Sequence, residues 1–339
     1  MTTTETLARQ GGKQTVSFSE ALREWGRIGV LSFGGPTAQI ALMHRVIVDE
    51  RKWLTEQQFL NALGFCMLLP GPEAMQLATY SGWRLHGLKG GLAAGLLFVL
   101  PGAFVVLALA MIYAAFGNVP VVEALFLGVK AAVLVIVVEA LLRIARRALK
   151  SLDHWLLAAL SFVAIFFLAL PFPLIVLLAA LYGFARGNAG DDASPPPSAI
   201  TVSPIQTVKT VATWLAIWVV PLAVLAFSFG PDHVLSQLGW FFSKLAVVTF
   251  GGAYAVLAYM GQDVVLHHQW LEAGQMMDGL GLAETTPGPL ILVTEFVGYL
   301  SAYLHGTGAP ALVMGSMGAM VALWATLAPC FVWIFAGAT

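Results

Sequence analysis

Long runs of hydrophobic residues alternate with short polar stretches along the chain. The runs lie at about 28–48, 58–83, 91–116, 119–142, 155–185, 208–229, 240–266, 275–304 and 309–336. A helix that crosses a bilayer needs about 20 predominantly apolar residues, and several of these runs reach that length. The pattern therefore predicts an all-α polytopic membrane protein.

The first hydrophobic residues follow a helical spacing. Ser17 precedes Glu20 by three residues, which is the pattern of a capping box. Phe18 and Trp25 fall on one face of the helix that would follow. We expect an interfacial amphipathic helix over 17–27 that leads into the membrane.

Proline, glycine and polar residues divide the chain. The run 155–185 is interrupted by "PFP" at 171–173, which predicts two short helices or one kinked helix. The stretch 186–204 is rich in Gly, Ser, Pro and Asp and is typical of a flexible linker. The predicted organisation is a polar tail at 1–16, a first transmembrane half at 17–185, the linker, and a second half at 205–339.

An internal repeat is the strongest pattern in the sequence. Matching motifs recur at an offset of 217 residues without a gap. The pairs are Phe33-Gly34-Gly35 with Phe250-Gly251-Gly252, Trp53-Leu54 with Trp270-Leu271, Pro70-Gly71-Pro72 with Pro287-Gly288-Pro289, Arg27 with Lys244, Ser32 with Thr249, and Asn61 with Asp278. After an insertion, "LPGAFVV" at 100–106 resembles "APCFVWI" at 328–334. The chain is thus predicted to be a fused pair of homologous halves.

Composition strengthens the membrane assignment. The chain is 59% hydrophobic and 10% charged, with a mean hydropathy of +0.83, whereas soluble domains carry about 25% charged residues. The bilayer is therefore the expected surrounding, and a net charge of −1 gives no reason to expect nucleic acid as a partner. Of the 17 Lys and Arg residues, only Lys209 and Lys244 lie beyond residue 204.

The placement of basic residues predicts the orientation of the halves, since short cytoplasmic loops collect Lys and Arg. The stretches 44–52 and 84–89 carry basic residues, and their counterparts 261–269 and 303–308 carry no Lys or Arg. This asymmetry predicts that the two halves are inverted. Two successive runs that both begin and end on the cytoplasmic side are then re-entrant hairpins with FGGP and PGP at their tips. The alternative is ordinary crossings with a weak charge bias.

The repeat also leaves one element without a counterpart. The apolar run 119–142 follows the Pro101 helix, and its match in the second half would lie beyond residue 339. Either the second half is naturally shorter, or the chain is truncated.

Residues 1–16 lack the pattern of a cleaved signal peptide. Cys66 and Cys330 lie in apolar segments without CxxC or metal-like spacing, and small core residues are the simpler interpretation. We expect no metal, no cofactor and no catalytic residues.

The motifs "LSFGGPTAQI", "LLPGPEAMQLATY", "TFGGAYAVL" and "TTPGPLILV" together resemble the chromate ion transporter family in its long form with two homologous halves. The resemblance covers about residues 18 to 336. It implies a multi-pass protein of the bacterial inner membrane that exports chromate, with sulfate as an isosteric competitor. Long-form relatives usually continue past "CFVWIF", which leaves open whether this chain is a complete transporter.

Broken helices at matching positions of two inverted halves are the best sequence indication of a transporter site, because irregular backbone at membrane depth is tolerated only in protein or at a cavity. Free N–H groups at a helix start suit a tetrahedral oxyanion. The predicted site therefore consists of backbone at Gly34, Gly35, Pro70, Gly71, Pro72, Gly251, Gly252, Pro287, Gly288 and Pro289, hydroxyls of Ser32 and Thr249, and the cations Arg27 and Lys244. The alternative for any single motif is a kink or a close-packing point.

Each candidate side chain also has a simpler interpretation. Arg27 could be an interfacial, snorkelling charge, and Lys244 is the better candidate because its surroundings are otherwise apolar. Ser32 and Thr249 could cap local backbone.

Acidic residues inside apolar segments are costly and usually functional. Glu73, Glu284 and Glu295 are therefore candidates for proton coupling. Glu73 at a helix start also fits ordinary dipole complementation.

The sequence thus favours a proton-coupled secondary transporter that exports chromate by alternating access at a midplane site, and not an enzyme. Uptake or exchange of sulfate or another divalent oxyanion is the alternative within transport. An anion channel remains open, as does a membrane-embedded reductase, which would need a redox cofactor or paired thiols. Homo-oligomerisation also remains open.

Overall fold

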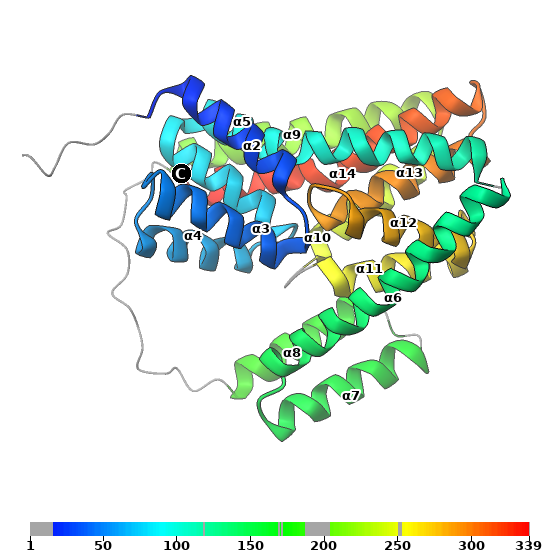
Figure 1. Ribbon diagram of the computed structural model, residues 1–339, viewed down its shortest axis with the longest axis horizontal. Helices are drawn as coiled ribbons and strands as arrows, with labels where there is room; N and C mark the ends of the chain where they lie inside the picture. The colour runs from blue at the N-terminus through cyan, green and yellow to red at the C-terminus, as the bar shows by residue number, and fades with distance from the viewer. Residues whose placement is uncertain are drawn as a thin grey trace, which may run out of the picture.

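The computed structural model describes residues 16–117, 119–168, 170, 172–186, 204–249 and 253–338. Within these ranges the secondary structure is helical, without strands (Figure 1). The elements are α2 (Phe18–Leu31), α3 (Gly35–His44), η1 (Arg45–Glu50), α4 (Glu56–Leu68), α5 (Glu73–Phe116), α6 (Pro120–Ala148), α7 (Leu152–Phe166), α8 (Phe172–Arg186), α9 (Pro204–Phe229), α10 (Val234–Val248), α11 (Ala253–Gln262), η2 (Asp263–His267), α12 (Ala273–Thr285), η3 (Leu290–Leu292), α13 (Val293–His305) and α14 (Ala311–Ala338). The predicted all-α fold is confirmed.

Three stretches of helix in the described part are long and apolar enough to cross a membrane. They are Glu73–Phe116, Thr207–Phe229 and Ala311–Gly337. Shorter apolar helices, such as α7 and α10, accompany them. The chain is thus a multi-pass membrane protein.

Helix α5 is a hairpin of two arms and not one continuous helix. The backbone leaves helical geometry at His86 (φ −137°, ψ 26°) and at Gly87 (φ 59°, ψ −149°). Next to this turn the arms touch through their backbones, because a Cβ on Gly82 would overlap the Gly90 carbonyl. Small residues allow such close approach of membrane helices. The first arm runs to the turn, and the second arm, 88–116, is long enough to span the bilayer.

The first half dips in and returns twice to the same end of the molecule. Arg51, just after η1, donates from Nη1 to Glu20 in the first turn of α2, at 3.1 Å. His86, at the turn of α5, donates from Nε2 to the Val16 carbonyl at 2.8 Å. Helix α2 has 14 residues and is therefore about 21 Å long, shorter than the ~30 Å hydrocarbon core. The predicted re-entrant hairpins are confirmed, with the FGG and PGP breaks at their tips.

The second half repeats these elements at the same offset. Helices α4 and α12 both begin after a capping box, formed by Thr55 with Gln58 and by Glu272 with Gln275. The elements η1 and η2 are both π-helical. The residues that follow them include the matched pair Lys52 and Gln269, with positive φ values of 53° and 52°. The predicted repeat therefore extends to individual backbone torsions.

The matched long helices show that the two halves are inverted. The second arm of α5 and helix α14 carry the matched LPGAFVV and APCFVWI segments. A Cβ on Gly91 would lie 2.8 Å from the Phe335 ring, and one on Gly95 would lie 2.9 Å from the Phe331 ring. Because one residue number rises as the other falls, these helices are antiparallel. Figure 1 accordingly places α4 and the end of α3 at the opposite end from the junction of α11 and α12.

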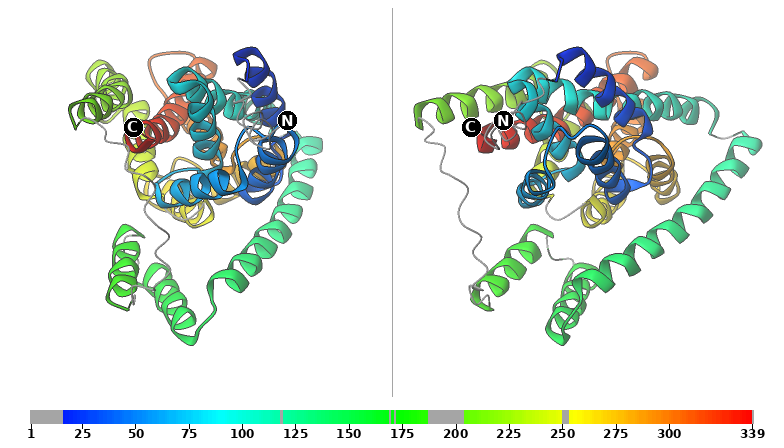
Figure 2. Two further views of the ribbon diagram at one scale, coloured as in Figure 1. Left: turned by 90° about the vertical axis from the view of Figure 1, so that its left-hand side faces the viewer. Right: turned by 60° about the vertical axis from the view of Figure 1, so that its left-hand side comes forward.

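The remaining helices connect the halves. Helix α6 packs on α12 and leads away from the main body to α7 and α8 (Figures 1 and 2). Arg186 at the end of α8 forms an ion pair with Asp153 of α7 at 2.7 Å. The run 155–185 therefore forms two short helices, as one of the two interpretations predicted, and α8 begins at Phe172 within the PFP segment. The tail at 1–15 and most of the predicted linker, 187–203, lie outside the described residues.

One expected element differs. The predicted interfacial helix at 17–27 is not separate from the first membrane run, because α2 continues without interruption from Phe18 to Leu31. Ser17 caps it as predicted, accepting from the Glu20 N–H at 3.2 Å. The buried face carries Trp25 and Ile28, so this helix packs against the protein core as the first arm of a hairpin.

Candidate functional site

Two reciprocal backbone hydrogen bonds join the tips of the two halves. The Gly71 N–H donates to the Thr249 carbonyl at 2.8 Å, and the Gly288 N–H donates to the Ser32 carbonyl at 2.8 Å. Gly71 and Gly288 are matched residues of the repeat, as are Ser32 and Thr249. Each PGP tip therefore bonds to the residue that precedes the FGG motif of the other half in the same way, which defines a local pseudo-twofold relation.

The tip glycines have backbone conformations that other residues rarely adopt. The φ angles are 83° at Gly34, 74° at Gly35, 116° at Gly71 and 96° at Gly288. Glycine reaches such angles without steric cost. The predicted site residues Gly251 and Gly252 lie outside the described residues.

The prolines place the helix starts at the tips. Pro72 is the N-cap residue of α5, and Pro289 is the N-cap residue of η3. Pro36 lies one residue inside α3. Pro70 and Pro287 precede the two tip glycines. The breaks are therefore helix termini in the middle of the protein.

Each PGP tip also packs against the long helix of the opposite half. A Cβ on Gly102 would overlap the Pro287 carbonyl oxygen, and a Cβ on Gly71 would lie 2.9 Å from the Cys330 sulfur. Gly102 and Cys330 occupy matched positions in the repeat, directly after Pro101 and Pro329. The two PGP tips, the residues Ser32 and Thr249, and the two long helices thus meet at one centre.

This centre collects the amino-terminal ends of α3 and α5, whose first N–H groups lack helical partners. Such ends carry positive partial charge and favour anions. The carboxyl-terminal ends of α2 and α10 also reach the centre, but the carbonyls of Ser32 and Thr249 accept the reciprocal bonds from glycine. The arrangement can therefore hold an oxyanion through backbone groups.

The two candidate hydroxyls bond to their own helices. Ser32 Oγ donates to the Ile28 carbonyl, and Thr249 Oγ1 donates to the Leu245 carbonyl, each at 2.6 Å. Both residues are buried. This is the local capping that the sequence left as the alternative, and each oxygen keeps acceptor capacity only.

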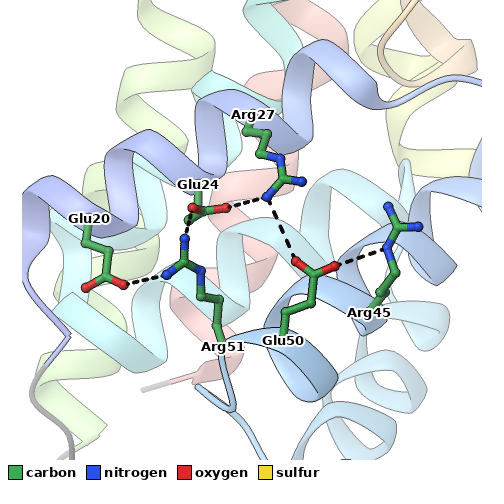
Figure 3. Close-up of polar contacts among 6 residues, drawn as sticks. All are labelled: Glu20, Glu24, Arg27, Arg45, Glu50 and Arg51. Carbon is green, nitrogen blue, oxygen red and sulfur yellow. Dashed lines mark hydrogen bonds and ion pairs between the residues drawn. The ribbon is translucent and has the colours of Figure 1, made fainter.

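Arg27 lies in an ion-pair network at the base of the first hairpin (Figure 3). Its guanidinium is 3.5 Å from Glu24 and 3.9 Å from Glu50. Arg51 pairs with Glu24, which is buried, and also with Glu20. The structure thus directs the Arg27 guanidinium away from the FGG tip.

Lys244 has a different environment from its repeat partner. Its ammonium lies 6.0 Å from the centroid of the Tyr259 ring, a cation–π distance. The side chain is exposed, and within the described ranges no carboxylate pairs with it. Thr249 follows five positions later, so the Cα of Lys244 lies about 7.5 Å along the helix from the tip.

The base of the second hairpin replaces the ionic network with aromatic rings. His268, the match of Arg51, stacks on Trp270 with ring centroids 4.1 Å apart, and Phe241 meets both rings edge-on. Desolvation beside these rings lowers the pKa of His268, so this position is mostly neutral at neutral pH. The two ends of the protein therefore differ in charge, as the sequence indicated.

The three acidic candidates lie close to the tips. Glu73 is the first residue of α5 and is partly buried, and Glu284 lies one residue before the end of α12. Glu295 in α13 is 2% exposed. Each lies within two helical turns of a PGP motif.

The structure adds two glutamines that the sequence did not single out. Gln39 Nε2 donates to the Gly288 carbonyl at 2.7 Å and to the Ser32 carbonyl at 3.3 Å, so it bridges both halves. Gln76 Nε2 donates to the Pro70 carbonyl at 2.7 Å. Their positions could have indicated them, because Gln39 follows Gly35 by four residues and Gln76 follows Pro72 by four residues.

A second polar link joins the halves away from the tips. The Tyr113 hydroxyl, on the long arm of α5, donates to Asp278 of α12 at 2.9 Å. Cys66 and Cys330 are free thiols and are buried. In the described ranges, no group of three or more His, Cys, Asp or Glu side chains could hold a metal ion.

Inverted halves, re-entrant hairpins and helix termini that meet at membrane depth define the class of this protein as a membrane transporter. The family described as "Chromate transporter" matches residues 19–184 and 236–339, one region in each half. The chain belongs to the chromate transporter family.

Relatives agree with this assignment. The chromate transport protein of Pseudomonas aeruginosa is 34% identical over 311 residues, covering 88% of this chain and 70% of the relative. The chromate transport protein of Cupriavidus metallidurans is 31% identical over 307 residues, covering 90% and 70%. The uncharacterized transporter YwrA of Bacillus subtilis is 29% identical over 158 residues, which is 45% of this chain and 88% of the relative. No solved structure matches the chain.

Proposed function

We propose that the protein is a secondary transporter of the bacterial inner membrane that exports chromate in exchange for protons. The observation that carries this proposal is the reciprocal bonding of the tips, Gly71 to Thr249 and Gly288 to Ser32. It gathers helix amino termini at membrane depth, where a tetrahedral oxyanion would be held by N–H groups. The names of the two longer relatives supply chromate as the oxyanion.

The same contacts suggest how access alternates. Each tip contact joins one hairpin from each half, so rocking one half against the other opens the centre to one side. The glycine torsions at the tips are suited to absorb such rotations. The bound anion would sit between tips that belong to opposite halves, and it would therefore be exposed to each face in turn.

The proposed direction of transport and its coupling to protons are argued from the placement of charged residues. The positive-inside rule favours the cytoplasmic side for the basic loops of the first half. Lys244 near a tip attracts an anion toward the centre, and Glu73, Glu284 and Glu295 are the groups that could exchange protons near it. Charged groups at such depth are costly, so their presence there favours a functional role.

The full chain reconstituted in proteoliposomes tests this proposal. We expect chromate to accumulate against its gradient when a proton gradient is imposed, and sulfate, which has the same shape, to compete more weakly. The variants Glu73→Gln and Glu295→Gln should still bind chromate but should lose the dependence of transport on the proton gradient, because an amide cannot take up or release a proton near neutral pH.

Other outcomes separate the alternatives. Chromate flux that follows only its own gradient, together with conductance, would identify a channel. Accumulation of sulfate but not chromate would show that sulfate is the transported anion. Conversion of the chromate to a lower oxidation state would indicate a reductase, and no flux of either anion would reject the proposal.

A further inference from the structure

Two buried amides lie at the tip contacts, one in each. Gln39 is 1% exposed and Gln76 is 0% exposed. Gln39 reaches the contact between Ser32 and Gly288, and Gln76 reaches the tip of Gly71. Side chains on a helix point back toward its amino terminus, so an amide four residues inside the helix covers its first turn.

Only the nitrogen of each amide is used within the protein. In the part of the chain that the structure describes, the Oε1 atoms of Gln39 and Gln76 are buried and have no hydrogen-bond partner. A buried acceptor without a donor costs about 1–3 kcal/mol, and buried polar groups are rarely left in that state. Two such oxygens at two helix starts indicate a ligand that brings a donor.

The chemistry at each helix start defines that ligand. Helix N–H groups bind oxygen atoms that carry negative charge, whereas a glutamine oxygen can bind only a hydrogen-bond donor. One small ligand satisfies both requirements when it is an oxyanion that carries one proton. Near neutral pH a fraction of chromate carries one proton, whereas sulfate and selenate carry none.

We propose that Gln39 and Gln76 are specificity-determining residues for a monoprotonated oxyanion, whose single hydroxyl donates a hydrogen bond to the Oε1 atom of one glutamine at a time. This inference rests on the proposed function. It implies that the tip site prefers hydrogen chromate to fully ionised anions of the same shape. A site built to bond a hydroxyl rejects the analogue that lacks it far more strongly than size alone permits.

The repeat shows that this preference belongs to one half. The matched positions in the second half are Val256 and Val293, which are both buried. Valine has no polar side-chain atom, so neither matched position in the second half can accept a hydrogen bond from the hydroxyl. The two halves thus contribute different parts of one recognition site.

Competition against chromate uptake by the reconstituted full chain tests the inference. Selenate and arsenate are close to chromate in size, but arsenate carries at least one proton at neutral pH and selenate carries none. We expect arsenate to inhibit the natural sequence at least about tenfold more strongly than selenate. In Gln39→Met and Gln76→Met that ratio should fall toward one, whereas Gln57→Met, at an exposed amide of α4, should leave it unchanged.

Each result decides the question. Equal inhibition by the two anions in the natural sequence overturns the inference without any variant. A uniform loss of transport in the methionine variants with an unchanged ratio would assign the glutamines a structural role only, with water as the partner of Oε1. Chromate uptake with an unchanged ratio rejects this inference alone, whereas no chromate uptake by the natural sequence rejects the proposed function as well.

Discussion

At the scale of single residues, the tips depend on glycines that cannot be replaced without strain. Gly288 combines a φ of 96° with close neighbours, since a Cβ there would lie 2.7 Å from Leu292 and 3.3 Å from the Cα of Gly102. The same residue donates the bond to Ser32. The backbone torsion, the close packing and the hydrogen bond thus each require glycine or its N–H at position 288.

We therefore expect Gly288→Ala to destabilise the protein by about 1–3 kcal/mol and to abolish chromate transport. Thermal unfolding in detergent and vesicle uptake would measure the two effects. Gly64→Ala is the matched control, because Gly64 in α4 has open space around its Cα and alanine favours a helix. Equal stability of both variants would contradict the role of the tip torsion.

Lys244 is the residue at which charge is expected to matter most. Lys244→Ala should abolish oxyanion transport while membrane insertion stays intact, because the variant removes a cation close to the tip and leaves the tip backbone unchanged. Lys209→Ala is the control, since it removes the other lysine of the second half, which lies near the start of α9. Transport retained by Lys244→Ala would remove this residue from the site.

At the scale of elements, each re-entrant hairpin is closed at its base by different chemistry. The first uses the ionic network of Glu20, Glu24 and Arg51, and the second uses the stacked rings of His268 and Trp270. The backbone geometry at both bases is nevertheless the same. The two halves therefore share the backbone fold of the hairpin but differ in the side-chain interactions that stabilise its base.

This difference predicts unequal effects at matched positions. Arg51→Gln leaves the buried carboxylate of Glu24 without its strongest partner and should cost about 2 kcal/mol of stability, a value reduced from that of a fully buried pair by the exposure of Arg51. His268→Gln should cost less than about 1 kcal/mol, because its ring loses only stacking contacts. Chemical denaturation of the two variants would reveal the difference, and equal losses would contradict it.

The sequence predicted the elements that depend on interactions between residues close together in the chain, and it missed those that depend on contacts between distant segments. Apolar runs, the proline breaks and the capping Ser17 are local signals, and the repeat itself disclosed the tips. The reach of Gln39 across 249 residues to Gly288, and the network that holds Arg27, depend on which segments meet in three dimensions. No single-sequence pattern contains that information, so the sequence assigned Arg27 to the tip.

At the scale of the whole molecule, inversion places equivalent loops on opposite faces of the membrane. Asp49 and His267 are exposed residues near the bases of the first and second hairpins. Because the α5 arm and α14 are antiparallel, the two bases lie at opposite ends of this helix pair. The basic residues around Asp49 favour the cytoplasmic side.

Labelling with a membrane-impermeant thiol reagent tests this arrangement. In right-side-out vesicles, Cys introduced by His267→Cys should react from outside, and Cys introduced by Asp49→Cys should react only after permeabilisation. The natural thiols of Cys66 and Cys330 are buried and should contribute little background. Reaction of both introduced thiols from one side would contradict the inverted arrangement.

The reciprocal bonds between the tips have a consequence for chains of half this length. Because Gly71 needs the carbonyl of Thr249 and Ser32 needs the N–H of Gly288, one half alone leaves both of its tips incomplete. A half-length chain could complete them only with a second half inserted upside down beside it. In the fused chain the two halves are covalently linked, so each half always has its partner. Each half can then change its own residues, as the glutamines of the first half and the lysine of the second illustrate.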